Sequence, residues 1–418
     1  MLKKILPILT IEICSTLVFL CFVALLTNSL SAEEYGDYAS AYSFVYFVFL
    51  ILLIGSDALS LKEISPSYDS NDSKGIRTQF VYFLIVILAT SLCLYSCIGI
   101  YFLYTPTSIY HPIFIISFFA PAFAFAYLSY CILIAFKKPI LASLLYSFFI
   151  PLSMLIAVYL AIKGGYLHDS ETAVVFVGSM WSVITILLIY KTISKTEVFG
   201  SINKIKWKPS LKLGITSMLF SIGNWSLTDI SVVLSEVFLS NESHVGVFSV
   251  VVVITVLYRK IIGRVIFTLL SPELAILIKA NDIKALKNML FKSYLILGAI
   301  TIVLTLIISY FSKAILSFYG LEYIIGSNSL VIMLLAQSIT ITFSLCTPTI
   351  NFYAKNRFIL VNSLMLIISI IFLSFFFSGY GIQGLSIAYL ITIVLVYSSQ
   401  IFYIHRILLK EQSAICNS

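Results

Sequence analysis

The sequence predicts an all-α integral membrane protein with about twelve transmembrane helices. Hydrophobic residues make up 60% of the 418 residues and charged residues only 11%, and the mean hydropathy is +1.06. In soluble domains about a quarter of the residues are charged, and a soluble fold would not bury this much apolar surface. Apolar runs of roughly 20 residues, the length that a helix needs to cross hydrocarbon, recur along the whole chain.

Twelve such runs are the expected spans. We interpret them as helices because transmembrane β-strands are about half as long and alternate apolar with polar residues. The spans are expected near residues 6–29, 38–61, 79–104, 112–135, 140–162, 173–190, 213–239, 245–268, 293–311, 325–350, 358–378 and 383–404.

The basic residues indicate the orientation. If the N-terminus is inside, only Lys163 and Lys313 of the 26 Lys and Arg residues fall outside, which leaves 24 on the cytoplasmic side. Cytoplasmic loops carry such an excess of positive charge, and a missed span would scramble it from that point onward. We therefore expect both termini to be cytoplasmic. The same topology accounts for the net charge of +8 without nucleic acid as a partner.

We expect two six-helix bundles. The bundles comprise residues 1–190 and 213–405, a basic cytoplasmic linker comprises 191–212, and a cytoplasmic tail comprises 406–418. A shift of 210 residues aligns Gly36 with Gly246 and Tyr38 with Phe248, which indicates a repeat. Because six is even, both bundles enter the membrane from the same side. The repeats are therefore parallel, with a cavity expected between them.

Three carboxylates fall inside expected spans, where an ionisable group costs about 2.5–3.5 kcal/mol and therefore faces protein or water. Glu12 lies in the first span, and Asp229 and Glu236 lie two turns apart in the seventh. Asn224 and Trp225 precede Asp229, with Trp225 expected on the same helical face. We interpret this face as a cavity wall with a carboxylate that takes a coupling proton or cation. The alternative is interhelical hydrogen bonding or, for Glu236, a position at the outer interface.

Three basic residues, Arg259, Lys260 and Arg264, lie in the inner half of the eighth span. One interpretation is a site for an anionic group, and phosphate suits the fork of an arginine. The alternative is snorkelling toward the cytoplasmic surface, which the charge bias favours for Arg264. Asp57, near the inner end of the second span, is expected at the membrane interface.

No sequence motif indicates an enzyme. The chain contains no phosphate-binding loop of the Walker type, no dinucleotide fingerprint, no His-Glu-x-x-His and no Cys-x-x-Cys. We therefore expect no catalytic residues, no metal and no cofactor. Transport is the function that a polytopic protein with only short outer loops favours.

Three short segments carry a resemblance to a known family. They are Glu-Tyr-Gly-Asp-Tyr at 34–38 (echoed at 245–248), Tyr-Gly-Leu-Glu-Tyr at 319–323, and Gly-Tyr-Gly-Ile-Gln-Gly-Leu-Ser-Ile-Ala at 379–388. With these segments and the layout of twelve spans, the chain resembles the bacterial O-antigen (Wzx-type) polysaccharide flippases. That family belongs to the multidrug/oligosaccharidyl-lipid/polysaccharide exporter (MOP) superfamily.

The resemblance implies a flippase in the bacterial inner membrane. Its cargo would be an undecaprenyl-diphosphate-linked oligosaccharide, moved from the cytoplasmic to the outer leaflet by alternating access. Membrane lipids, a polysaccharide polymerase and a chain-length regulator are the partners that the resemblance implies. We infer from charge and depth that Arg259 and Lys260 hold the diphosphate and that Asp229 or Glu12 handles coupling.

Three alternatives remain. A cation-coupled multidrug exporter of the same superfamily has the same number of spans, and Glu12 would be its cation site. A membrane polysaccharide polymerase or ligase usually has a large outer loop, whereas the longest one expected here is 312–325. A major-facilitator transporter should carry a Gly-x-x-x-Asp-Arg-type motif after the second span, and residues 62–77 lack it.

Overall fold

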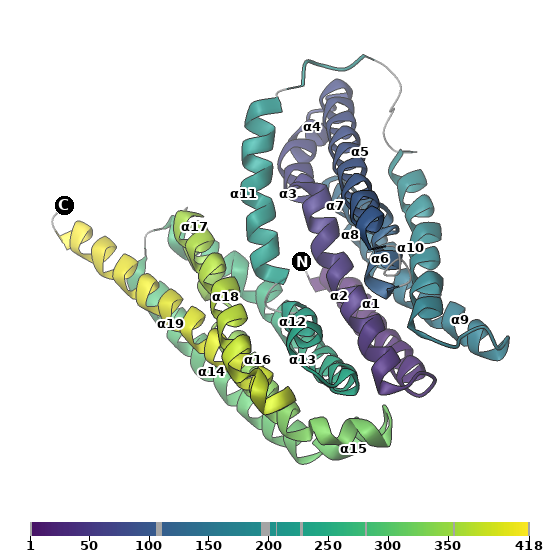
Figure 1. Cartoon of the computed structure of the whole chain (residues 1–418). Coiled ribbons are helices and arrows are strands. Elements are labelled where there is room, and N and C mark those ends of the chain that lie inside the picture. The colour runs from purple at the N-terminus through teal and green to yellow at the C-terminus, as the bar shows by residue number, and fades with distance from the viewer. Residues whose placement is uncertain are drawn as a thin grey trace. The chain divides into compact units, whose positions relative to one another are not determined.

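The computed structural model describes residues 2–105, 111–193, 201–205, 207–225, 229–280, 282–353 and 356–416. Every regular element in these ranges is a helix (Figure 1). The chain separates into two compact units, unit 1 at Met1–Trp225 and unit 2 at Ser226–Ser418.

Unit 1 is built around α2 and α7. In this unit α2 packs against α5, α6, α7, α10 and α11, while α1 packs against α9. The elements are α1 (Leu2–Thr27), α2 (Ala32–Leu53), α3 (Ser56–Leu59), η1 (Ser60–Ile64), α4 (Ser65–Asp69), α5 (Ser73–Tyr104), α6 (Pro112–Ser117), α7 (Ala120–Ala135), α8 (Pro139–Ser143), η3 (Leu144–Phe149), α9 (Ile150–Lys163), α10 (Ser170–Ile193) and α11 (Trp207–Trp225).

Unit 2 is built around α16, which packs against α13, α14 and α19. The elements are α12 (Ile230–Phe238), α13 (Glu242–Lys279), α14 (Ile283–Tyr310), α15 (Ser312–Ser317), η4 (Leu321–Gly326), α16 (Ser327–Thr342), α17 (Cys346–Phe352), α18 (Asn356–Phe377), η5 (Ser378–Tyr380) and α19 (Gly381–Cys416).

The helices follow the expected spans. Each of the twelve expected ranges falls on one helix or on helices in tandem, and nine stretches of the described residues are long and apolar enough to cross a membrane. This confirms a multi-pass, all-helical membrane protein. The count of twelve crossings and the cytoplasmic termini stay predictions.

Two expected spans are interrupted near a proline. Pro121 stands at the start of α7, after α6 has ended at Ser117. In the fifth span, the π-helix η3 directly precedes α9, whose second residue is Pro151. Proline has no N–H, so Pro151 cannot donate to the carbonyl of Ser147 four residues before it. That carbonyl instead accepts a hydrogen bond from the Ser15 hydroxyl of α1.

The seventh expected span is divided between the units. α11 ends at Trp225 in unit 1, and Asp229 stands immediately before α12 in unit 2. The single helical face expected for Trp225 and Asp229 is therefore not formed by one described helix. The division into six plus six helices at 191–212 stays a prediction, since the boundary between the compact units falls at residue 225.

A close backbone contact holds α11 in unit 1. α2 ends in two left-handed residues, Ile54 (φ 42°) and Gly55 (φ 70°). A Cβ added to Gly214 of α11 would lie 2.3 Å from the Ile54 carbonyl oxygen, and one added to Gly55 would lie 2.2 Å from the Gly214 oxygen. Only glycine on both sides permits this approach.

Candidate functional site

A buried tyrosine marks the centre of the polar interior of unit 2. Tyr389 of α19 is 1% exposed and Gln337 of α16 is completely buried. The Gln337 amide donates a hydrogen bond to the Tyr389 hydroxyl at 3.0 Å. The other amide atom, Gln337 Oε1, is buried and has no hydrogen-bond partner among the described residues. An unfilled buried acceptor of this kind is typical of a position that water or a ligand occupies.

Two opposite charges act on this tyrosine. Asp229, at the start of α12, and Arg259, in α13, both interact electrostatically with Tyr389. Arg259 also interacts electrostatically with Tyr397, which lies about two turns after Tyr389 in α19. The Tyr397 hydroxyl hydrogen-bonds to Thr340. Asp229 and Arg259 are half-buried. Four helices of unit 2 thus bring an acid, a base, an amide and two phenols together.

A chain of hydroxyl groups supports the helix that carries Arg259. The hydroxyl of the preceding residue, Tyr258, donates to the Thr301 carbonyl at 3.3 Å and lies 3.4 Å from the Ser338 hydroxyl. Ser338 in turn lies 2.6 Å from the Thr305 hydroxyl. Because these contacts join α13 to α14 and α16, they fix the rotation of α13 about its axis.

The other residues expected at this site are placed less centrally. Lys260 is exposed, whereas Glu236 in α12 is half-buried. Trp225 is buried in unit 1, with its ring 5.1 Å from that of Phe47 in α2. The side chains of Asn224 and Arg264 lie outside the described part of the structure.

The interior of unit 1 is lined by aromatic rings. The Phe123 and Trp181 rings stack with centroids 3.9 Å apart, and the Tyr130 and Tyr146 rings lie 4.9 Å apart. The five tyrosines of this aromatic cluster are half-buried and come from α2, α7 and η3: Tyr42, Tyr46, Tyr127, Tyr130 and Tyr146. The π-helix η3 carries Tyr146, and π-bulges are frequent at functional sites.

Two carboxylates are buried in the described part of unit 1, Glu12 (5% exposed) and Asp57 (9% exposed). The turn at Gly55 directs α3, which carries Asp57, against α7 and α11. The position expected for Asp57 at the membrane interface stays a prediction. Backbone N–H groups and the Ser221 hydroxyl hydrogen-bond to the Asp57 carboxyl. Glu12 lies on α1, which packs against η3 and α9.

The residues that sequence reasoning missed are Gln337, Tyr389 and Tyr397. Gln337 carried a usable signal, because it is an amide in the middle of the tenth apolar run. The two tyrosines of α19 did not stand out among the 26 tyrosines of the chain.

Comparisons with known proteins show a shared fold. No family model and no curated protein matches the sequence, whereas solved structures match over almost the whole chain. An inward-facing multidrug resistance MATE family transporter of the MOP superfamily matches with a TM-score of 0.78 and 13% identity, covering 95% of this chain and 96% of that one. The lipid II flippase MurJ, in an inward closed conformation, matches with a TM-score of 0.69 and 16% identity, covering 98% and 90%.

A third structure agrees with these two. A MOP superfamily transporter from Pyrococcus furiosus matches with a TM-score of 0.61 and 12% identity, covering 97% of this chain and 95% of that one. The solved structures named here are transporters or flippases. The chain therefore has the fold of the MOP superfamily transporters and is a multi-pass membrane protein.

Proposed function

We propose that the protein is a flippase of the Wzx type. It moves an undecaprenyl-diphosphate-linked oligosaccharide from the cytoplasmic to the outer leaflet of a bacterial inner membrane by alternating access. The fold supports this proposal, because the lipid II flippase MurJ shares it. The lipid tail of such a cargo stays in the bilayer, so the protein need only supply a hydrated path for the diphosphate and the glycan.

The observation that carries the proposal is the position of Arg259. Its guanidinium is half-buried and acts on two buried phenols, Tyr389 and Tyr397. A guanidinium binds phosphate oxygens through paired hydrogen bonds, and the interaction gains strength away from bulk water. The phenols and the Gln337 amide add neutral hydrogen-bonding groups beside the charge. This combination suits an anionic cargo better than a cationic drug.

The aromatic cluster of unit 1 supports a glycan as the second part of the cargo. Sugar rings have apolar faces that pack on aromatic rings, and the five tyrosines add hydroxyl groups. Two of them, Tyr42 and Tyr46, already place their hydroxyls 3.3 Å apart. Asp229 and Glu12 are the proposed coupling carboxylates, since an ionisable side chain at membrane depth is a default candidate for ion or proton coupling.

The test replaces Arg259 and Lys260 together by glutamine in a strain that depends on this protein for surface glycan. We expect the surface glycan to fall at least tenfold while lipid-linked repeat units accumulate on the cytoplasmic leaflet, because the diphosphate loses its charged partner. The matched control is Arg357→Gln with Lys313→Gln, which removes the same charge at other positions. Wild-type glycan at normal expression of the double variant would show that the diphosphate role is wrong.

A second candidate is a cation-coupled multidrug exporter. The higher TM-score of the MATE transporter, 0.78 against 0.69 for MurJ, favours it. Here Glu12 would be the cation site, and Glu12→Gln would abolish drug resistance while surface glycan stayed normal. Measuring resistance and glycan in the same deletion strain separates the two functions.

A further inference from the structure

A polar pocket in unit 1 shares no residue with the aromatic cluster or with the Arg259 site. Its volume is about 610 Å³, and it lies between η1, α4, α5, the segment 201–205 and α11. Lys62, Lys204 and Lys212 line it together with one carboxylate, Glu63. Three positive charges and one negative charge leave the lining with an excess of two positive charges. A pocket of this size accommodates a small ligand or a lipid headgroup.

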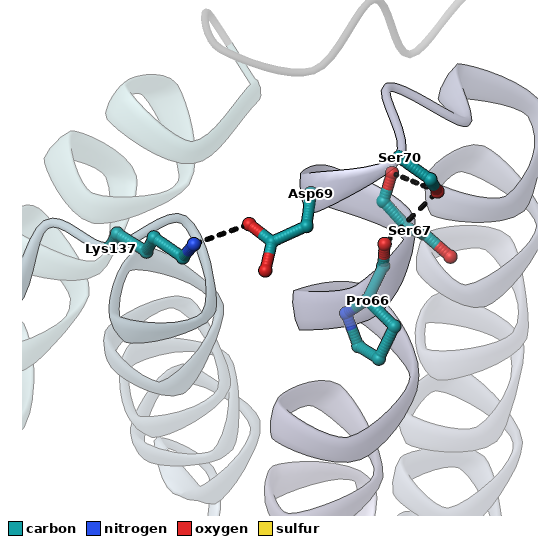
Figure 2. Close-up of polar contacts among 5 residues, drawn as sticks. All are labelled: Pro66, Ser67, Asp69, Ser70 and Lys137. Atoms are coloured by element: carbon teal, nitrogen blue, oxygen red, sulfur yellow. Dashed lines mark hydrogen bonds and ion pairs between the residues drawn. The ribbon is translucent and has the colours of Figure 1, made fainter.

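The three lysines of this basic pocket are available to a ligand. Each is exposed, and within the described ranges none forms an ion pair with a carboxylate. The acidic residue that ends α4, Asp69, does not line the pocket. Its carboxylate is bound to Lys137 at 2.5 Å (Figure 2).

The walls of the basic pocket are held in place by specific contacts. The Asn203 N–H donates to the Thr78 hydroxyl of α5 at 2.8 Å, and the ring of Trp207 at the start of α11 lies 5.3 Å from that of Tyr82. These contacts fasten both the segment 201–205 and α11 to α5. A ligand therefore meets a largely preformed site and need not order the chain itself.

α4, which packs against α5, also lines the basic pocket. The Ser67 hydroxyl donates to the Glu63 carbonyl at 3.0 Å. The Ser70 hydroxyl hydrogen-bonds to the carbonyls of Pro66 and Ser67, at 3.0 and 3.3 Å (Figure 2). Ser67 itself lines the pocket, and it contributes an uncharged hydrogen-bonding group beside the lysines.

The expected topology places the basic pocket at the cytoplasmic surface of the membrane. Lys62, Lys204 and Lys212 all belong to the basic residues on that side, and Trp207 beside them is 42% exposed. Tryptophan is enriched at the depth of the lipid headgroups. The cytoplasmic leaflet carries anionic lipids, and basic pockets between helices on this side bind their phosphates.

We propose that the basic pocket binds a phosphate-bearing anionic group at the cytoplasmic surface, through the ammonium groups of Lys62, Lys204 and Lys212. Hydroxyl and amide groups of the walls, such as Ser67 and Asn203, complete the site. The group is the headgroup of an anionic phospholipid or a free phosphate. This proposal is independent of the cargo, since it holds for a flippase and for a drug exporter alike.

The test measures binding to the purified full-length protein in detergent, with phosphatidylglycerol, phosphatidylcholine and inorganic phosphate as separate probes. The pocket variant is Lys62→Gln/Lys204→Gln/Lys212→Gln. The control is Lys74→Gln/Lys208→Gln/Lys284→Gln, which loses the same charge at residues that do not line the pocket. We expect the pocket variant to lose about a hundredfold in affinity for the anionic probe and the control to keep the wild-type value.

A variant of Glu63, the carboxylate of the lining, should raise the affinity. Glu63→Gln removes the negative charge of the lining, so affinity for the same probe should rise severalfold. A response to phosphatidylglycerol alone identifies a lipid headgroup, and a response to inorganic phosphate identifies a soluble ligand. Equal losses in the two triple variants, a lower affinity of Glu63→Gln or no binding of either anionic probe would each overturn the proposal.

Discussion

The interiors of the two units combine aromatic rings with charge in different ways. In unit 1 the five tyrosines of the aromatic cluster contact other rings, such as Phe123 and Trp181. In unit 2, Tyr389 and Tyr397 of α19 hydrogen-bond to an amide and a hydroxyl, both interact electrostatically with Arg259, and Tyr389 also interacts with Asp229. Bundles expected from a repeat therefore carry different chemistry. The ring faces of unit 1 are suited to a neutral sugar, whereas the mixed charges of unit 2 are suited to an ionised group.

The largest effect on stability is expected at the contact between Gly214 of α11 and the turn that follows α2, which belongs to unit 1 alone. We expect Gly214→Ala to lower the free energy of unfolding by about 1–3 kcal/mol, a typical cost of overpacking, because the new methyl group meets the Ile54 carbonyl. Gly298→Ala in unit 2 is the control, since its nearest atom, Thr342 Cγ2, is 3.6 Å away. Thermal unfolding in detergent measures both variants. Equal melting temperatures would show that α11 does not rely on this contact.

Replacing tyrosines by phenylalanine separates the chemistry of the rings from that of the hydroxyls. In unit 2, Tyr389→Phe leaves the buried Gln337 amide without its acceptor, and we expect a cost of about 1 kcal/mol in stability together with reduced transport. In unit 1, Tyr130→Phe keeps the ring that packs on Tyr146, and we expect nearly wild-type transport. Tyr130→Ala, which removes the ring, should reduce it severalfold. Surface glycan and melting temperature are the two measurements.

Opposite results in the two units would reverse the interpretation. If Tyr130→Phe abolished transport while Tyr389→Phe did not, hydrogen bonding in unit 1 and packing in unit 2 would be the dominant effects.

The sequence predicts those features of the structure that the hydrocarbon environment determines, and it does not predict those that depend on how the helices pack. Hydrocarbon imposes helix length and the absence of strands, so the positions of the helices followed from apolar runs alone. Arg259 and Asp229 were found because a charge at membrane depth stands out. The polar groups around these charges cannot be predicted in this way. Gln337 and Tyr389 are 52 residues apart, and their hydrogen bond depends on how α16 and α19 are rotated against each other.

Asp57 shows the same limit from the other direction. The apolar run places Asp57 near its inner end but does not predict that the side chain is buried, which follows from the left-handed residues Ile54 and Gly55 turning α3 against α7 and α11. A contact with Gly214, far along the chain, selects that turn. The residue types at Gly55 and Gly214 alone do not predict this contact.

The smallest effect is expected at Asp57 of α3. Its buried carboxyl accepts hydrogen bonds from backbone N–H groups and from the Ser221 hydroxyl. Asp57→Asn replaces one carboxylate oxygen by an amide nitrogen that cannot accept, so we expect the free energy of unfolding to fall by about 0.5 kcal/mol. The control is Asp69→Asn, which removes an exposed ion pair and should cost less. Thermal unfolding in detergent measures both variants. Equal losses would show that the turn at Gly55 does not enclose the Asp57 carboxyl.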